Sequence, residues 1–336
     1  MRRALCVAFG CAVACGGNGD RRVTAPVDAR SDPQLDRQAL VRDLEATVLE
    51  NYSQLTLGNF EAFRDGVAGD QPIVLLGVSP RDVVYGVAPP GVAVDRRPYR
   101  RFGPTIYSKN LDIHLSADGS VAWVFDEISY RVQYMGRQAS IPIRVTGVYV
   151  RDVERWVLVM EHQSYAIASD DILRFAATGQ LRKPGEMKNR YVKSEGASTL
   201  LLRTAGRFHN SDERYRQRKL STQDDALILL PDPDHEFRGA KTADAPSLPA
   251  LFGDGATVGL RDYRVHVARS RRVAWIAANL VIRATLDGDP VEVELRATYV
   301  FENRSEWGWE IVQMHVSAPV HLRELTRRIF GTVRSE

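Results

Sequence analysis

Polar side chains that can do acid–base or binding chemistry recur on three strand-like segments near the middle of the chain. Glu127, Arg144, His162 and Ser164 each stand among apolar residues of such a segment. Alternate residues of a strand share one face, so these side chains can meet on one surface of a sheet. A carboxylate beside an imidazole can transfer protons, and burial would raise the pKa of the carboxyl group. Glu127 and His162 are therefore the predicted catalytic pair if the protein is an enzyme.

The same segments occur twice in the sequence. A shift of 152 residues places nine identical residues in register between His114 and Val148, a stretch of 35 positions. A shift of 153 then aligns His162 with His315 and Ser164 with Ser317. The period is too long for a solenoid and indicates two copies of one domain.

Both copies supply candidates for a ligand pocket, provided that these strand faces turn to the concave side of a curved sheet. Alternation along the last strand of each copy predicts that Trp156 shares a face with His162. The second copy has Asn279 where the first has Glu127, so only the first copy keeps the carboxylate. The predicted ligand-binding residues are Trp123, Arg144, Thr146, Trp156, Ser164, Trp275, Asn279, Arg296, Thr298, Trp309, His315 and Ser317.

Structural roles are the competing interpretation of the same residues. The four repeated tryptophans can be core residues, and the two arginines can pair with acids at the rim of a sheet. The His-x-Ser pairs can hydrogen-bond to backbone at a strand end.

Each copy begins with helices and continues with long strands. Leu40, Leu44, Val48 and Tyr52 recur every fourth residue, as in an amphipathic helix that Gly58 ends. We predict an α+β fold with antiparallel sheets. The predicted helices are 35–57, 60–67 and 197–207, with shorter ones near 170–175 and 321–330; the predicted strands are 107–115, 121–133, 141–150, 156–167, 261–267, 273–285, 291–301 and 309–318.

The order and spacing of these motifs resemble the SnoaL-like branch of the nuclear-transport-factor-2-like superfamily. The resemblance rests on Val121-Ala-Trp123, Arg144-x-Thr146 and Trp156-x5-His162-x-Ser164, and on their repeats in the second copy. It covers residues 36–167 and 195–318 and implies two tandem cone-shaped domains, each with helices packed on a strongly curved sheet. The fold hosts isomerases, dehydratases, cyclases and binding modules, so it does not decide the activity.

The N-terminus predicts a bacterial lipoprotein. Two arginines precede a short apolar stretch that ends Ala12-Val-Ala-Cys15, which resembles a lipobox in which Cys15 is lipidated. The other two cysteines, Cys6 and Cys11, would leave with the signal peptide. The predicted organisation is a signal peptide with its lipobox cysteine (1–15), a tether (16–35), domain 1 (36–180), a linker (181–194) and domain 2 (195–336).

Composition and motifs give no support for binding of nucleic acid, nucleotides or zinc. The chain has 336 residues, 44% of them hydrophobic, with a formal charge of +3. This balance gives no reason to expect nucleic acid as a partner. The glycines of 253–259 lack the spacing of a nucleotide-binding loop, and no cysteine pair suits zinc. We expect no cofactor and no metal.

We therefore predict a lipid-anchored envelope protein that faces the periplasm or the cell surface. It would be a non-enzymatic binding or adaptor protein. It would hold a small hydrophobic ligand or an envelope protein, and its two domains would form an intramolecular pseudo-dimer. The alternative is an acid–base enzyme, an isomerase, dehydratase or hydrolase, acting on a hydrophobic small molecule in the pocket of domain 1.

Overall fold

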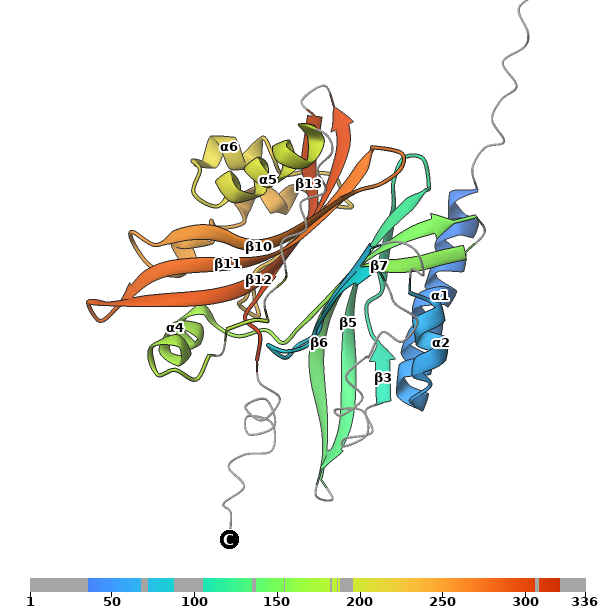
Figure 1. Ribbon diagram of the computed structural model, residues 1–336, viewed down its shortest axis with the longest axis horizontal. Helices are drawn as coiled ribbons and strands as arrows, with labels where there is room; N and C mark the ends of the chain where they lie inside the picture. Colours follow the sequence, from blue (N-terminus) through green and yellow to red (C-terminus); the bar gives the residue numbers. More distant parts are fainter. Residues whose placement is uncertain are drawn as a thin grey trace, which may run out of the picture. The chain divides into compact units, whose positions relative to one another are not determined.

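Two helix-covered β-sheets follow one another along the chain in the computed structural model (Figure 1). The structure describes residues 36–67, 72–87, 105–134, 137–153, 155–181, 183–185, 187, 196–305 and 308–320. The predicted lipobox, tether and C-terminal helix near 321–330 lie outside these residues, as does most of the linker. Residues 36–336 form one unit, and the description below concerns that unit alone.

Domain 1 contains the first sheet and its helices. The helices on this sheet are α1 (Arg37–Leu57) and α2 (Phe60–Asp65); α4 (Ser169–Ala177) follows the sheet in the chain but packs against β12 and β11 of the second sheet. The strands are β1 (Pro72–Leu76), β2 (Val83–Val87), β3 (Thr105–Ser108), β4 (Asp112–Leu115), β5 (Val121–Tyr134), β6 (Arg137–Asp152) and β7 (Arg155–Ser164).

Helix α1 forms because its sequence supplies both ends and one apolar side. The side chain of Asp36 accepts a hydrogen bond from the Ala39 amide at 2.9 Å, which caps the first turn. Gly58 ends the helix in the left-handed conformation with φ of 70°, which glycine adopts without strain. Leu44 and Val48 are almost fully buried against the sheet, as the four-residue spacing predicts.

The first sheet has the strand order β2-β1-β7-β6-β5-β3, with β4 also paired to β5. Most pairs are antiparallel, as predicted, but β1 runs parallel to β7 and makes the sheet mixed. The predicted strand 107–115 is divided at Lys109 and Asn110, whose backbone amides both donate to the Asp126 carboxylate, although the Lys109 amide also donates to the carbonyl oxygen of Glu127 at 3.0 Å.

Domain 2 repeats this plan with fewer strands. Its helices are α5 (Gly196–Phe208) and α6 (Glu213–Gln217), with short 3-10 turns at Gly239–Asp244 and Pro249–Leu251. Its strands are β8 (Leu227–Leu229), β9 (Glu236–Arg238), β10 (Thr257–Val267), β11 (Val273–Leu286), β12 (Asp289–Ser305) and β13 (Gly308–Ser317). The order is β10-β11-β12-β13-β8-β9, and β8 runs parallel to β13 as β1 does to β7.

Within this unit the helices lie on the outer sides of the sheets, so that the opposite faces of the sheets approach each other (Figure 1). Helices α1 and α2 cover the first sheet, and α5 and α6 cover the second. Side chains of β6 and β7 hydrogen-bond with side chains of β12 and β13. Each sheet therefore has a helix-facing side, here called the interior of its domain, and a side in the contact between the sheets, here called the inter-sheet face.

Candidate functional site

The two repeated histidines meet at the inter-sheet face. The rings of His162 and His315 stack with centroids 3.9 Å apart and planes inclined by 22°. Both residues are fully buried, and burial is the main cause that lowers their pKa values well below the ordinary value for histidine. Two neutral imidazoles can stack in this way without charge repulsion.

Hydroxyl groups from both domains satisfy all four ring nitrogens. His162 is bonded through Nδ1 to Oγ1 of Thr298 at 3.2 Å and through Nε2 to Oγ of Ser317 at 2.8 Å. The reciprocal bonds join His315 to Thr146 at 2.9 Å and to Ser164 at 2.7 Å. This reciprocal pattern uses every nitrogen, so neither imidazole is free to accept a proton from a ligand in this arrangement.

The two repeated arginines make a second pair of reciprocal contacts between the domains. Arg144 of domain 1 donates to the carbonyl oxygen of Leu230 at 2.9 Å and also reaches the carbonyls of Pro231 and Asp232. Arg296 of domain 2 donates to the carbonyl oxygens of Gly77 and Pro80 in domain 1. Burial lowers the pKa of each guanidinium to about 10, which leaves both charged at neutral pH.

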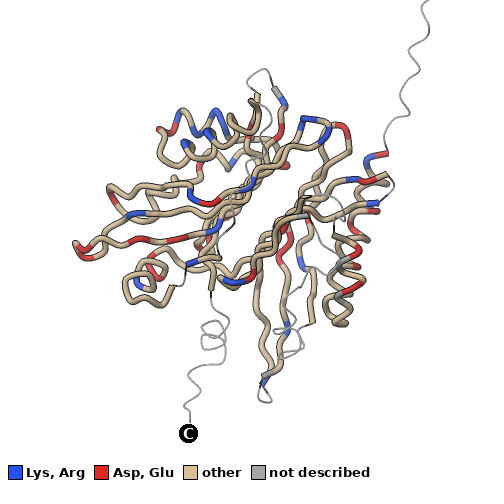
Figure 2. The backbone as a smooth tube through the Cα atoms, viewed as in Figure 1, with Lys and Arg blue, Asp and Glu red and all other residues tan. Residues whose placement is uncertain are grey.

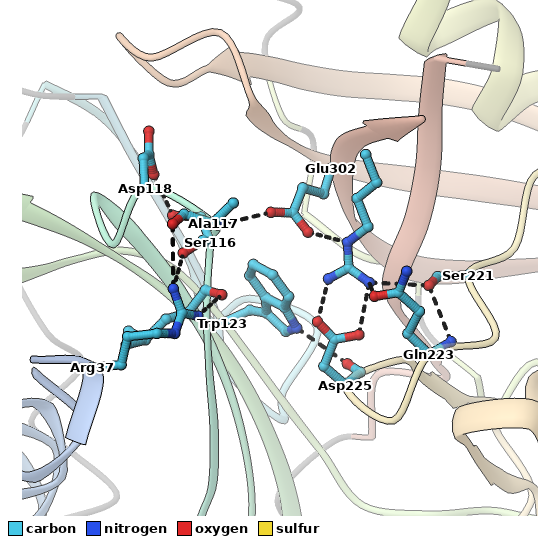
Figure 3. Close-up of polar contacts among 11 residues, drawn as sticks. Arg37, Ser116, Ala117, Asp118, Trp123, Ser221, Gln223, Asp225 and Glu302 are labelled. Carbon is cyan, nitrogen blue, oxygen red and sulfur yellow. Dashed lines mark hydrogen bonds and ion pairs between the residues drawn. The ribbon is translucent and has the colours of Figure 1, made fainter. Parts of the chain in front are cut away.

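Trp123 lies in a third contact between the domains (Figure 3). Its indole nitrogen donates to the carbonyl oxygen of Asp225 at 3.3 Å. The guanidinium of Arg304 bonds to the carboxylates of Asp225 and Glu302, and Glu302 accepts a hydrogen bond from the Ala117 amide at 3.3 Å. Phe125, on the same strand face as Trp123, packs in one apolar cluster with Leu227 and Leu229. The expected orientation is thus wrong: these side chains turn to the other domain and not to the helices.

A β-bulge in the last strand of each domain changes the predicted alternation. The pairing of β6 with β7 shifts between Val148 and Tyr149, which moves Trp156 to the face opposite His162. The pairing of β12 with β13 shifts between Val300 and Phe301 and does the same to Trp309. The expectation that Trp156 shares a face with His162 is therefore wrong, because one extra residue reverses the side-chain pattern.

The remaining sequence candidates have partners other than the two histidines. Glu127 pairs with Lys109 at 3.1 Å, and its side chain is 37% exposed. Asn279 donates to Asp262 and to the carbonyl oxygen of Gly185. Trp275 packs on His266 with ring centroids 5.8 Å apart. Glu127 and His162 are thus on one sheet face but in different environments, and their catalytic role stays a prediction.

The interior of domain 1 holds a polar cluster that the sequence interpretation missed. Asp126 and Glu161 are the direct neighbours of Glu127 and His162, and they point to the opposite side of the same strands. Tyr52 of α1 interacts electrostatically with both carboxylates and with Tyr149, so the four acidic groups form one cluster. We call Tyr52, Asp126, Tyr149 and Glu161 the acidic cluster.

Burial controls the protonation of the acidic cluster. It raises the pKa of Glu161 to about 7, and the amide of Gln163, 2.7 Å from Oε1, opposes that shift only in part. Burial also raises the pKa of Asp126, against the hydrogen bonds from Ser108, from two backbone amides and from Tyr52. Desolvation likewise raises the pKa of Tyr52 and Tyr149 above the ordinary value for tyrosine.

The corresponding interior of domain 2 is different. Ala278 and Met314 stand at the positions of Asp126 and Glu161, and Phe301 stands at the position of Tyr149. This interior contains His209, which bonds to the Tyr299 hydroxyl at 2.6 Å, and the buried side chain of Arg216. Burial and the nearby Arg216 lower the pKa of His209 to about 3. The described part of this interior therefore keeps a cationic group and no copy of the two carboxylates.

The sequence carried a signal for the acidic cluster. Asp126 and Glu161 each interrupt an apolar strand in the first copy, and an apolar residue replaces each in the second. Residues shared by both copies drew attention to the inter-sheet face, whereas residues that differ between the copies mark the interior. In the described residues, no group of three or more His, Cys, Asp or Glu is placed to hold a metal ion.

The fold and these sites define a tandem α+β protein with two curved, helix-covered sheets. The SnoaL-like domain family matches residues 96–168 and 199–321, more than half of the chain and parts of both copies, so the protein belongs to that family. No curated protein matches it significantly.

Several solved structures are similar to a part of the chain. A protein from Catenulispora acidiphila is 17% identical, with 38% of this chain and 92% of that one covered and a TM-score of 0.33. A nuclear transport factor 2-like protein from Salmonella enterica is 16% identical, with 38% of this chain and 90% of that one covered and a TM-score of 0.31. A putative scytalone dehydratase from Novosphingobium aromaticivorans is 12% identical, with 39% of this chain and 86% of that one covered and a TM-score of 0.33.

Proposed function

We propose that this protein binds a small molecule in the interior of domain 1, with domain 2 as its fixed structural partner. The observation that carries the proposal is the acidic cluster, which has two buried carboxylates that domain 2 lacks. Buried ionisable groups without a cationic partner destabilise a fold, and groups with such perturbed pKa values concentrate at functional sites. Packing alone gives no reason for domain 1 to keep them where domain 2 has alanine and methionine.

The second part of the proposal is that the two domains form an intramolecular pseudo-dimer. The reciprocal bonds of His162 and His315 and of Arg144 and Arg296 support it, because each copy makes the same contact on the other. A buried, hydrogen-bonded contact of this kind fixes the orientation of the two sheets. The inter-sheet face then serves assembly, and the interior of domain 1 serves binding.

An acid–base enzyme is the second candidate, and the raised pKa of Glu161 favours it. A carboxyl group with a pKa of about 7 can both accept and donate protons near neutral pH. The Tyr52 hydroxyl, in the same cluster, could hydrogen-bond to a reacting oxygen. In this version Glu161 and Asp126 take the place of Glu127 and His162 as the groups that touch the substrate.

Attachment to the cell envelope is also part of the proposal and rests on Cys15 and the preceding apolar stretch. No helix in the described part of the chain is long and apolar enough to cross a membrane. Lipidation of Cys15 predicts that the full chain sediments with membranes and that Cys15→Ala releases it. A Cys15→Ala protein that stays membrane-bound would contradict the lipid anchor.

Mass spectrometry of small molecules released from the purified full-length protein tests the binding function. We expect a stoichiometric ligand from the wild-type protein and from Glu127→Gln, and none from the double variant Asp126→Asn, Glu161→Gln. Thermal unfolding of the same samples checks that the double variant is folded. Equal amounts of ligand from the wild type and the double variant would place the ligand elsewhere and refute the proposal.

A further inference from the structure

The stacked histidines lie beside two positive charges at the inter-sheet face. Burial is the largest cause that lowers the pKa values of both imidazoles, the guanidinium of Arg144 lowers both further, and that of Arg296 lowers the pKa of His162. In the described chain, charged residues run along α1 and mark the ends of hairpins, while long stretches of the strands between carry none (Figure 2). A proton on His162 or His315 would therefore add a third buried positive charge to this contact.

The acidic residues of the surrounding elements do not balance such a charge. Asp232 and Glu236 act on Arg144, and Asp82 acts on Arg296, so these carboxylates compensate the guanidiniums. No acid among the described residues is one of the groups that shift the pKa of either imidazole. The other titratable side chains around the contact have partners of their own: Glu127 with Lys109, Glu294 with Arg261 and Lys183, Glu302 with Arg304, and His235 with Asp232.

The hydrogen bonds of the pair are complete while both rings are neutral. A neutral imidazole donates from one nitrogen and accepts at the other, and a hydroxyl group can take either role. Each ring bonds to two hydroxyl groups of the other domain. When the domains separate, water reaches both rings, and their pKa values return to the ordinary value for histidine. Protons therefore bind to the separated form in preference to the closed form.

We propose that the contact between the two domains is a pH-sensitive switch, closed at neutral pH and weakened by acid, with His162 and His315 as its sensors. This inference rests on the pseudo-dimer of the proposed function and adds its regulation. A histidine whose pKa is low in the closed form stabilises that form above the ordinary pKa of about 6.5 and loses this contribution as pH falls below it. Between pH 7.5 and 5.0, each ring raises the ratio of separated to closed protein about 30-fold, and both rings raise it about 900-fold.

Energy transfer between fluorescent dyes on the two domains tests the switch on the full-length protein. The dyes are attached through azide-bearing residues at positions 57 and 200, which are exposed on α1 and α5. Urea titrations at pH 7.5 and 5.0 then give the ratio of separated to closed protein, and circular dichroism of the same samples shows whether the domains are still folded. We expect energy transfer to change before circular dichroism does, and the ratio to rise about 900-fold from pH 7.5 to 5.0.

Glutamine variants assign the pH dependence to the two rings. His162→Gln and His315→Gln should each reduce the rise to about 30-fold, and the double variant should nearly abolish it. His209→Gln is the matched control, because His209 is also fully buried but lies in the interior of domain 2. It should keep the full rise.

The outcomes distinguish the switch from the pseudo-dimer. Energy transfer at pH 7.5 that equals that of the urea-separated protein would refute both. A contact that is closed at pH 7.5 but responds to acid equally in the wild type and the double variant would overturn the switch alone. Loss of energy transfer and of circular dichroism at the same urea concentration would also overturn it, because the contact would then have no open state of its own.

Nuclear magnetic resonance of the wild-type histidine ring protons gives a second test that needs no folded variant. Two of the seven histidine signals should stay at their neutral positions as pH falls. They should then shift together, at the pH where energy transfer changes. If all seven rings titrate near their ordinary pKa while energy transfer stays constant, the two sensors are not held neutral by the contact and the switch is refuted.

Discussion

Adjacent residues of the same strands point to the inter-sheet face and to the interior of domain 1. The two copies keep the same residue types at the first of these faces and different ones at the second. At the inter-sheet face, His162 and Arg144 keep their residue types at His315 and Arg296. In the interior, Asp126 and Glu161 become Ala278 and Met314. Each copy is the binding surface of the other at the inter-sheet face, so a change on one side disturbs both. The interior of one copy can change without such an effect.

The comparison teaches that a repeated constellation of His, Ser, Thr and Arg can be an assembly device. Such residues satisfy one another across the contact, with every nitrogen of the two histidines bonded to a hydroxyl. The acidic cluster differs from this contact, because its two buried carboxylates have no repeated partner in the other copy and Oδ2 of Asp126 is buried without a hydrogen bond of normal geometry. The predictions below change one region at a time.

The largest expected effect comes from the buried arginines. Arg296→Met removes the donors that bond to the carbonyl oxygens of Gly77 and Pro80, and only the Pro80 carbonyl keeps another donor, the Gly185 amide at 2.7 Å. We expect the free energy of unfolding to fall by about 3 kcal/mol, measured by denaturant titration. Arg283→Met, whose side chain is 68% exposed, is the matched control and should change stability by less than ~0.5 kcal/mol. Similar losses in both variants would mean that the inter-sheet contact contributes little.

Glu161→Gln should act in the opposite direction, because it removes a carboxyl group that is costly to ionise. The native state holds this proton up to a pH of about 7, whereas the unfolded chain releases it near the ordinary value. The wild type therefore loses stability as pH rises through that window. The free energy of unfolding of the variant should exceed that of the wild type from pH 4.5 upward, and the difference should reach ~3 kcal/mol above pH 7. A difference that does not depend on pH would mean that Glu161 is not held protonated.

The sequence predicted the two copies, the order of helices and long strands, and the helix α1 that Gly58 ends, because these depend on local pattern and on repetition. It did not predict the parallel pairs β1–β7 and β8–β13, because the short strands β1 and β8 are apolar throughout and carry no directional pattern. For the candidate site, the sequence pointed to side chains that lie at the inter-sheet face and not to the acidic cluster on the opposite face of the same strands. Alternation shows which residues share a face, and it does not say whether that face meets helices or another sheet.

The stacked histidines should give an intermediate effect. His162→Ala removes the bonds to Thr298 and Ser317 and leaves a void beside His315. We expect a loss of about 2 kcal/mol in unfolding free energy, with the ligand-binding affinity of domain 1 unchanged. A double-mutant cycle with Ser317→Ala should show a coupling of about 1 kcal/mol. Loss of ligand binding in a folded His162→Ala would return this residue to the binding site.

Glu127→Gln should have the smallest effect and is the sharpest comparison with Glu161→Gln. Its partner Lys109 is also exposed, and surface ion pairs of this kind contribute less than ~1 kcal/mol. We expect unfolding free energy and ligand affinity within error of the wild type, measured on the same samples as Glu161→Gln. A loss of binding or turnover in Glu127→Gln, with Glu161→Gln unaffected, would reverse the assignment. The functional face of the strand would then be the one that carries Trp123 and Phe125, and the acidic cluster would be a structural feature.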